Sequence, residues 1–247
     1  DQHAFFGAVA KAVLSPKDTD DIPRVTAEAV RLSTDGRPGP VVVQIPRDVS
    51  SMDTASAIPT PAARTPHEPD AALVDKAVAM IDGAKAPLVV AGEMISNQNA
   101  ADALTKFAAA AGLPVMSAYR RLDVMPNSHD CYAGHLEINR FENQLEAIDQ
   151  SDLIISVGTR LDGITSADET MFCTGKPLIH IYPEADILAR FESDVALDAD
   201  MEPDLAALTA KLSPPDTARS ARTTELHTSF MAFSQPGNFT AYGDVDL

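Results

Sequence analysis

The sequence is poor in cysteine and has no long apolar segment, and each shortage excludes a class of protein. Its 247 residues include two cysteines, Cys131 and Cys173, which are too few for a disulfide framework and form no CxxC pair. We expect both thiols to be buried or half-buried in a reducing cytoplasm. No apolar run reaches membrane-spanning length and no signal segment opens the chain, so the sequence predicts a cytoplasmic protein without a membrane span.

Basic residues are scarce as well. Lys and Arg number 19 against 36 Asp and Glu, which gives a net charge of -17 and a pI near 4.5. Nucleic acids and anionic membrane surfaces attract clustered Lys and Arg, so this balance argues against both as partners. The sequence therefore favours a globular protein with a strongly acidic surface.

The common motifs of catalysis and cofactor binding are missing. There is no GxGxxG after the first strand, no GxxxxGK[ST], no GxSxG, no HExxH and no paired Cys/His spacing. His129 stands beside Asp130 and Cys131, but neighbours on an irregular stretch rarely face one centre, so we expect a loop histidine. His180 lies inside an apolar strand and is expected to be a hydrogen-bonded core residue. Motifs alone indicate no catalytic apparatus.

The N-terminal part of the sequence predicts a helix followed by one strand. Periodic apolar residues predict a helix over 21–34, and the run VVVQI predicts a strand over 41–45, with no earlier strand expected to pair with it. Residues 50–70 contain four prolines with Ser, Thr and Ala and show no periodicity. We interpret this stretch as a linker and place a domain boundary there.

Residues 71–212 alternate between short apolar strands and amphipathic helices. This pattern predicts a mostly parallel sheet with helices on both faces, which is a doubly wound, Rossmann-like α/β fold. From residue 213 to 247 the chain is polar, and we expect an irregular linker or tail. The expected strands are 87–91, 113–117, 152–157, 177–182 and 195–198, and the expected helices are 71–82, 97–111, 140–149, 184–191 and 203–211, with 118–139 irregular.

Ligands of open parallel sheets bind at the carboxyl ends of the strands. Three such ends carry candidate residues here. Gly92 follows strand 87–91, Gly158 and Arg160 follow strand 152–157, and Glu184 follows strand 177–182. A glycine lets the backbone approach a ligand, an arginine suits a phosphate, and a glutamate can bind ribose hydroxyls. The alternative is that the glycines are ordinary turn residues and that Arg160 pairs with a local acid.

Several stretches, in this order, resemble one family. They are HAFFGAVAKAV, DIPRVTAEAVRLSTDG, GRPGPVVVQIPRDV, PLVVAGEMISNQNAADALTKFAAAAGLPVMS, SDLIISVGTRLD and IYPEADIL. Together they cover residues 1–212 and resemble the thiamine diphosphate-dependent enzymes of the acetolactate synthase, benzoylformate decarboxylase and pyruvate oxidase type. In that family GRPGPV and the strand after it close the pyrimidine-binding domain, and the later stretches form the central domain.

The resemblance implies a fragment of a multidomain enzyme. Residues 1–49 would be the C-terminal remnant of a pyrimidine-binding domain, 71–212 the central domain, and 213–247 a linker toward a diphosphate-binding domain. The activating glutamate and the Gly-Asp-Gly metal motif would lie outside the chain, since Tyr242-Gly243-Asp244-Val245 breaks that motif. We therefore expect an inactive central domain of a 2-keto acid decarboxylase or carboligase. Its parent would bind thiamine diphosphate and Mg²⁺, and its partners would be the other domains in a homodimer or homotetramer.

Some members of this family bind FAD or an ADP moiety in the central domain, and others bind nothing there. Two departures from the nucleotide-binding pattern, at Ala91-Gly92-Glu93 and at Gly163-Ile164, argue against tightly bound FAD. Glu93 would place a negative charge against a pyrophosphate. A nucleotide-binding module and a free-standing scaffold stay open as alternatives. The positions that match the nucleotide site are Gly92, Gly158, Arg160, Glu184 and Asp200.

The strand over 41–45 would normally belong to a sheet whose earlier strands are absent. An unpaired strand edge invites pairing with another chain. We therefore expect residues 1–49 to be ordered by contacts outside their native sheet, or to be exchanged between copies of the chain. The alternative is that they complete the central sheet, which would move the domain boundary.

Overall fold

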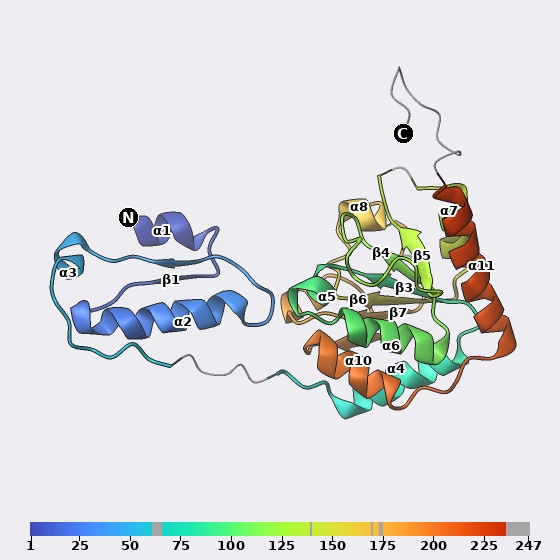
Figure 1. Cartoon of the computed structure of the whole chain (residues 1–247), viewed down its shortest axis with the longest axis horizontal. Helices are drawn as coiled ribbons and strands as arrows, with labels where there is room; N and C mark the ends of the chain where they lie inside the picture. The colour runs from blue at the N-terminus through green and yellow to red at the C-terminus, as the bar shows by residue number, and fades with distance from the viewer. Residues whose placement is uncertain (61–65, 139, 169, 173–174, 236–247) are drawn as a thin grey trace, which may run out of the picture. The chain divides into compact units, whose positions relative to one another are not determined.

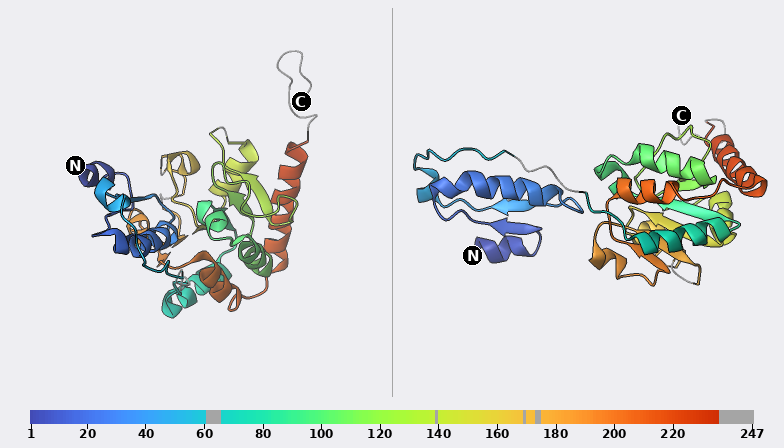
Figure 2. Two further views of the ribbon diagram at one scale, coloured as in Figure 1. Left: turned by 60° about the vertical axis from the view of Figure 1, so that its left-hand side comes forward. Right: turned by 90° about the horizontal axis from the view of Figure 1, so that it is seen from below.

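The computed structural model describes residues 1–60, 66–138, 140–168, 170–172 and 175–235. Cys173 and the stretch 242–245 lie outside these residues. The chain divides into two compact units, Asp1–Pro66 (unit 1) and His67–Leu247 (unit 2), which Figures 1 and 2 show as ribbons. No helix within the described residues is long and apolar enough to cross a membrane.

Unit 1 is a small α/β piece built on two parallel strands. Ala12 pairs with Val41 and Leu14 with Val43, and the amide of Gln44 donates to the carbonyl of Leu14 at 2.8 Å. Its elements are α1 (Gln2–Gly7), β1 (Ala12–Leu14), a 3₁₀ turn (Thr19–Asp21), α2 (Ile22–Thr34), β2 (Val41–Val43) and α3 (Arg47–Ser50).

The expectation that no strand precedes β2 is wrong. β1 precedes it and pairs with it inside unit 1, and among the described residues β2 does not join the sheet of unit 2. A three-residue strand within AVAKAVL has no pattern of its own, and only its tertiary partner makes it a strand. The apolar core of unit 1 is small, since Val25 and Ala29 are its buried hydrophobic side chains in the described part.

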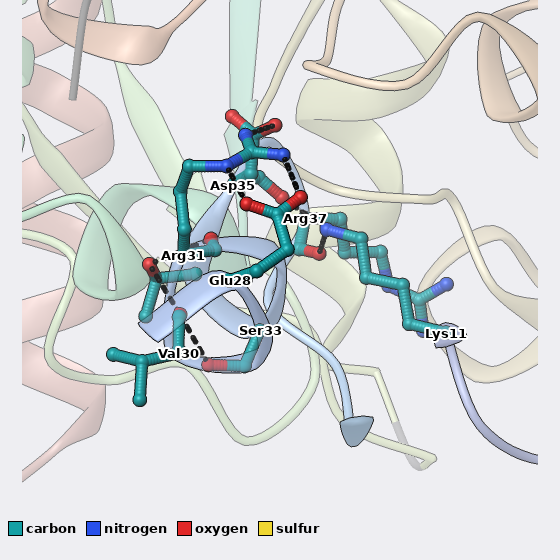
Figure 3. A network of polar contacts seen from close by, with 8 residues as sticks. Lys11, Glu28, Val30, Arg31, Ser33, Asp35 and Arg37 are labelled. Carbon is teal, nitrogen blue, oxygen red and sulfur yellow. Dashed lines mark hydrogen bonds and ion pairs between the residues drawn. The ribbon is translucent and has the colours of Figure 1, made fainter. Parts of the chain in front are cut away.

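Polar contacts hold the end of α2 and the turn that follows it (Figure 3). Arg31 pairs with Glu28 at 2.8 Å and with Asp35 at 3.3 Å. The Lys11 ammonium, just before β1, donates to the carbonyls of Asp35 and Arg37. The two ion pairs of Arg31 are exposed, and exposed ion pairs contribute little to stability. The hydrogen bonds of Lys11 connect the start of β1 to the loop that leads into β2.

Unit 2 contains a parallel sheet of six strands in its described part. They are β3 (Pro87–Ala91), β4 (Val115–Ser117), β5 (Tyr132–His135), β6 (Leu153–Val157), β7 (Leu178–Ile181) and β8 (Val195–Leu197). The order is β5-β4-β3-β6-β7-β8, with every pairing parallel. The chain winds outward from β3 in one direction and from β6 in the other, which is the doubly wound arrangement. The predicted fold class is confirmed.

Helices cover both faces of this sheet (Figures 1 and 2). α4 (Ala71–Gly83), α6 (Ala101–Ala111) and α10 (Met201–Thr209) pack on one face, and α7 (Glu142–Asp149) packs on the other. Strand residues alternate accordingly: Val89 and Ile155 join the first core, whereas Val90 and Ile154 join the second. The remaining helices are the short α5 (Glu93–Asn97), α8 (Gly163–Ser166) and α9 (Ala185–Leu188), and α11 (Thr217–Phe233).

Two segments of unit 2 differ most from the sequence expectation, which also missed the short helices α5 and α8 and started the helix 97–111 before Ala101. The stretch 118–139 was expected to be irregular but contains β5, whose YAGH sequence has neither alternation nor a β-branched run, and β4 meets it through a register shift. The stretch after Ser213 contains the 17-residue helix α11, which lies along β5 (Figure 1). Its apolar residues are too few for a helical stripe, and polar side chains anchor it instead: Thr223 Oγ1 donates to the carbonyl of Gly112 at 2.7 Å.

Candidate functional site

The predicted site lies where the winding direction of the sheet reverses, at the carboxyl ends of β3 and β6. The two turns that follow these strands bind each other directly. The amide of Gly92 donates to the carbonyl of Val157, and the amide of Met94 donates to the carbonyl of Gly158, each at 2.9 Å. A doubly wound sheet ordinarily binds a nucleotide at this position. Here the two turns are instead hydrogen-bonded to each other.

Both glycines are required by this packing. A Cβ on Gly92 would stand 2.3 Å from the Cβ of Thr159, which is far inside contact distance. Gly158 has a φ of 63°, in the left-handed region, and a Cβ there would meet Met94 and Met201 at 3.0–3.1 Å. The close approach made by Gly92 is thus to the protein's own chain.

A glycine-to-alanine pair tests this close packing. We expect Gly92→Ala to lower the free energy of unfolding by about 2 kcal/mol, because the buried Thr159 backbone and side chain cannot yield without moving β6. Gly83→Ala is the matched control: a Cβ there meets nothing within 4 Å, and alanine at this helix end should be neutral or stabilising. Urea unfolding of both variants measures the difference, and equal effects would contradict the close approach.

Arg160 pairs with an acid. Its Nε lies 2.9 Å from Oε1 of Glu93, and the hydroxyl of Tyr182 donates to the same oxygen at 3.0 Å. The Glu93 side chain is 11% exposed and that of Arg160 is 36% exposed. From the sequence, Glu93 was expected only as a charge opposed to pyrophosphate. Tyr182, which follows β7 directly and stands two residues before Glu184, was not among the candidate residues.

His180 is a hydrogen-bonded core residue, as predicted. It is fully buried on β7, and its Nε2 lies 3.0 Å from the carbonyl of Thr159. Burial lowers the pKa of His180 to about 4, so the imidazole is neutral at physiological pH. His129 lies in the loop before β5, where its Nδ1 accepts from the amide of Cys131, itself buried. Both contacts are hydrogen bonds to backbone groups.

The other two predicted residues lie at the same edge of the sheet. Glu184 is half-buried and stands at the N-cap position of α9. Asp200 is buried at the start of α10, and both of its carboxylate oxygens are engaged: Oδ2 accepts from the amide of His67 and Oδ1 from Gln98, each at 2.8 Å. The amide oxygen of Gln98 accepts in turn from the amide of Met201.

The structure thus brings Gly92, Gly158 and Arg160 together. Asp200 is held separately, by its hydrogen bonds to His67 and Gln98. The partner Gln98 lies 102 positions away in sequence, and no local pattern could have identified it. Whether these five residues bind a cofactor stays a prediction. No group of three or more His, Cys, Asp or Glu side chains in the described part of the chain could hold a metal ion.

An open pocket of about 450 Å³ lies at the carboxyl ends of β4, β5 and β6. Its walls come from three separate loops, so no local sequence pattern indicates it. One guanidinium nitrogen of Arg140, Nη2, donates to the carbonyls of Ile164 and Thr165. The lining residues are Tyr119, Ile138, Arg140, Asp162, Gly163, Ile164 and Asp168.

Residues 74–208 match the family model described as thiamine pyrophosphate enzyme, central domain. The chain is 33% identical over 165 residues to the acetolactate synthase large subunit of Corynebacterium glutamicum, covering 65% of this chain and 26% of that protein. It is 27% identical over 244 residues to the chloroplastic acetolactate synthase 2 of Nicotiana tabacum, covering 92% and 35%. The chain therefore spans about a quarter to a third of the length of these curated relatives.

Solved structures share the fold. A putative thiamin diphosphate-dependent enzyme isolated from Mycobacterium smegmatis superposes with a TM-score of 0.72 at 24% identity, covering 88% of this chain and 42% of that one. Benzoylformate decarboxylase from Polynucleobacter necessarius superposes with a TM-score of 0.71 at 20% identity, covering 85% and 40%.

Proposed function

The chain belongs to the thiamine pyrophosphate enzymes and carries their central domain, and from this premise we propose that its role in the whole protein is architectural. The observation that carries the proposal is the match over residues 74–208, which coincides with a complete, doubly wound sheet. Both faces of that sheet are covered by helices, so unit 2 forms its own core. A domain of this kind can link cofactor-binding domains and hold their spacing.

In our proposal the whole protein is a thiamine diphosphate-dependent decarboxylase or carboligase acting on 2-keto acids. The names of its relatives, acetolactate synthase and benzoylformate decarboxylase, support this reaction class. Family membership implies thiamine diphosphate, usually with Mg²⁺, as the cofactors of the whole enzyme. The described residues offer no cluster for a metal ion, so we assign neither group to a residue of this chain.

Residues 1–49 fit, in this proposal, the end of a pyrimidine-binding domain, joined through 50–70 to the central domain, with 213–247 leading away from it. The small parallel sheet of unit 1 supports the first assignment, because parallel strands are normally covered on both faces and β1 and β2 are only half-buried. A homodimer or homotetramer, and a cytoplasmic location, complete the proposal.

An assay of the 247-residue chain tests the architectural role. We expect no turnover of pyruvate or benzoylformate with thiamine diphosphate and Mg²⁺, and no heat of binding when the cofactor is titrated in. An intact acetolactate synthase, assayed in parallel, shows that the conditions support catalysis. Turnover by the chain would refute the proposed role, since an architectural domain lacks the groups that activate the cofactor.

A further inference from the structure

Glu93 is the most unusual side chain at the reversal point of the sheet. It follows the glycine turn after β3 directly, yet it points inward and is 8% exposed as a residue. Buried carboxylates require donors, and this one has two on a single oxygen, Arg160 Nε at 2.9 Å and the Tyr182 hydroxyl at 3.0 Å. Three strand ends therefore meet at one carboxylate: Glu93 follows β3, Arg160 follows β6, and Tyr182 follows β7 directly.

The two donors form an anion-binding pair. Guanidinium and phenolic hydroxyl groups are the donors that proteins use for phosphates as well as for carboxylates. Ligands of a doubly wound sheet ordinarily bind in the crevice at this reversal point, within reach of donors placed at the strand ends. Here the anion that they bind is already part of the chain.

We propose that the Glu93 carboxylate occupies the position that a diphosphate group would take in this domain. By this internal closure Glu93 prevents the central domain from binding nucleotides. Its carboxylate takes the anion position between Arg160 and Tyr182, and its negative charge repels any phosphate that approaches them. The close packing of Gly92 on Thr159 fixes the backbone that carries Glu93. This inference concerns ligand selection by unit 2 and is independent of the architectural role proposed above.

The proposal predicts that removing the carboxylate opens the site. In Glu93→Ala the donors of Arg160 and Tyr182 lose their internal anion, and we expect ADP and inorganic pyrophosphate to bind at least about tenfold more tightly than to the wild-type chain. Glu93→Gln removes the charge and keeps the volume, so its affinity should lie between the two. Isothermal titration of the 247-residue chain with each probe measures these affinities.

Two controls separate the site from a general charge effect. Glu192→Ala removes the same charge from an exposed position before β8 and should bind neither probe more tightly than the wild type. Adding Arg160→Ala to Glu93→Ala should abolish the gained affinity, because the guanidinium is the principal donor. Circular dichroism confirms folding before titration, and the near-isosteric Glu93→Gln serves if the alanine variant unfolds.

The outcomes are distinct. Gained affinity in the Glu93 variants that disappears with Arg160→Ala supports internal closure. Wild-type binding of ADP as tight as that of Glu93→Ala would overturn it, as would unchanged affinity in a folded Glu93→Gln. A gain that Glu192→Ala reproduces would also overturn it, since the effect would then be one of overall charge.

Discussion

Replacing Arg219 by alanine is expected to lower the free energy of unfolding of unit 2 by about 3 kcal/mol or more. Arg219 is 6% exposed as a residue, and its guanidinium donates to four backbone carbonyls near the ends of two helices. Those of Ile81, Asp82 and Ala84 belong to the end of α4, and that of Ala111 is the last of α6. Terminal carbonyls are short of donors within their own helix, and although that of Ile81 also accepts from the amide of Ala84, the variant removes the side-chain donor of all four.

Denaturant unfolding of Arg219→Ala, followed by circular dichroism, measures this loss. Arg219→Lys should recover part of it, because an ammonium keeps the charge but cannot reach several carbonyls with one planar group. Thr224→Ala, on the exposed side of α11, is the matched control and should change stability by no more than about 0.5 kcal/mol. A loss in Arg219→Ala no larger than in this control would show that α11 does not depend on the buried arginine.

The second large effect concerns Asp204, on the buried face of α10. Its side chain is fully buried, and neither carboxylate oxygen has a hydrogen-bond partner among the described residues. Burial raises the pKa of Asp204 from 3.8 to about 8, and the nearby carboxylates of Asp200, Asp198 and Glu68 add to the shift. The carboxyl is therefore protonated in the folded protein at neutral pH.

This shift makes stability fall as the pH rises. Between about pH 4 and pH 8 the folded state holds a proton that the unfolded chain has released, so each pH unit costs about 1.4 kcal/mol until the folded carboxyl ionises. Asp204→Asn stays neutral at every pH. We expect it to match the wild type near pH 4 and to exceed its free energy of unfolding by several kcal/mol near pH 8.

Urea unfolding of both proteins across this range measures the difference, and all groups common to them cancel. Glu202→Gln removes a similar carboxylate from the exposed side of the same helix and should follow the wild-type pH profile. A constant difference between Asp204→Asn and the wild type from pH 4 to pH 8 would show that Asp204 ionises normally in the folded state.

The sequence predicted the sheet of unit 2 better than the elements at its margins. β3 was expected over 87–91 and has those bounds, because PLVVA is a fully buried apolar run that ends at a glycine. β5 was missed because YAGH is a strand only through its pairing with β4. α11 was missed because polar side chains, rather than an apolar stripe, hold it to the carbonyls of other elements.

The sequence placed three candidate residues at one edge of the sheet but did not indicate their contacts. Strand ends and glycines are local features, so Gly92, Gly158 and Arg160 could be assigned to one edge of the sheet. The interpretation that Arg160 pairs with a nearby acidic side chain agrees with its ion pair to Glu93. The contact itself joins residues 67 positions apart, and only folding brings them within hydrogen-bond distance.

By itself, the sequence determined a doubly wound parallel sheet, because short apolar runs alternating with amphipathic helices can be buried in few other ways. The tertiary structure alone decided that β1 pairs with β2, that α11 is a helix, and that Glu93 lies buried between Arg160 and Tyr182. Each of these depends on a partner distant in sequence. A polar or short segment takes its conformation and its ionic contacts from that partner, whereas a long apolar pattern carries its own preference for burial.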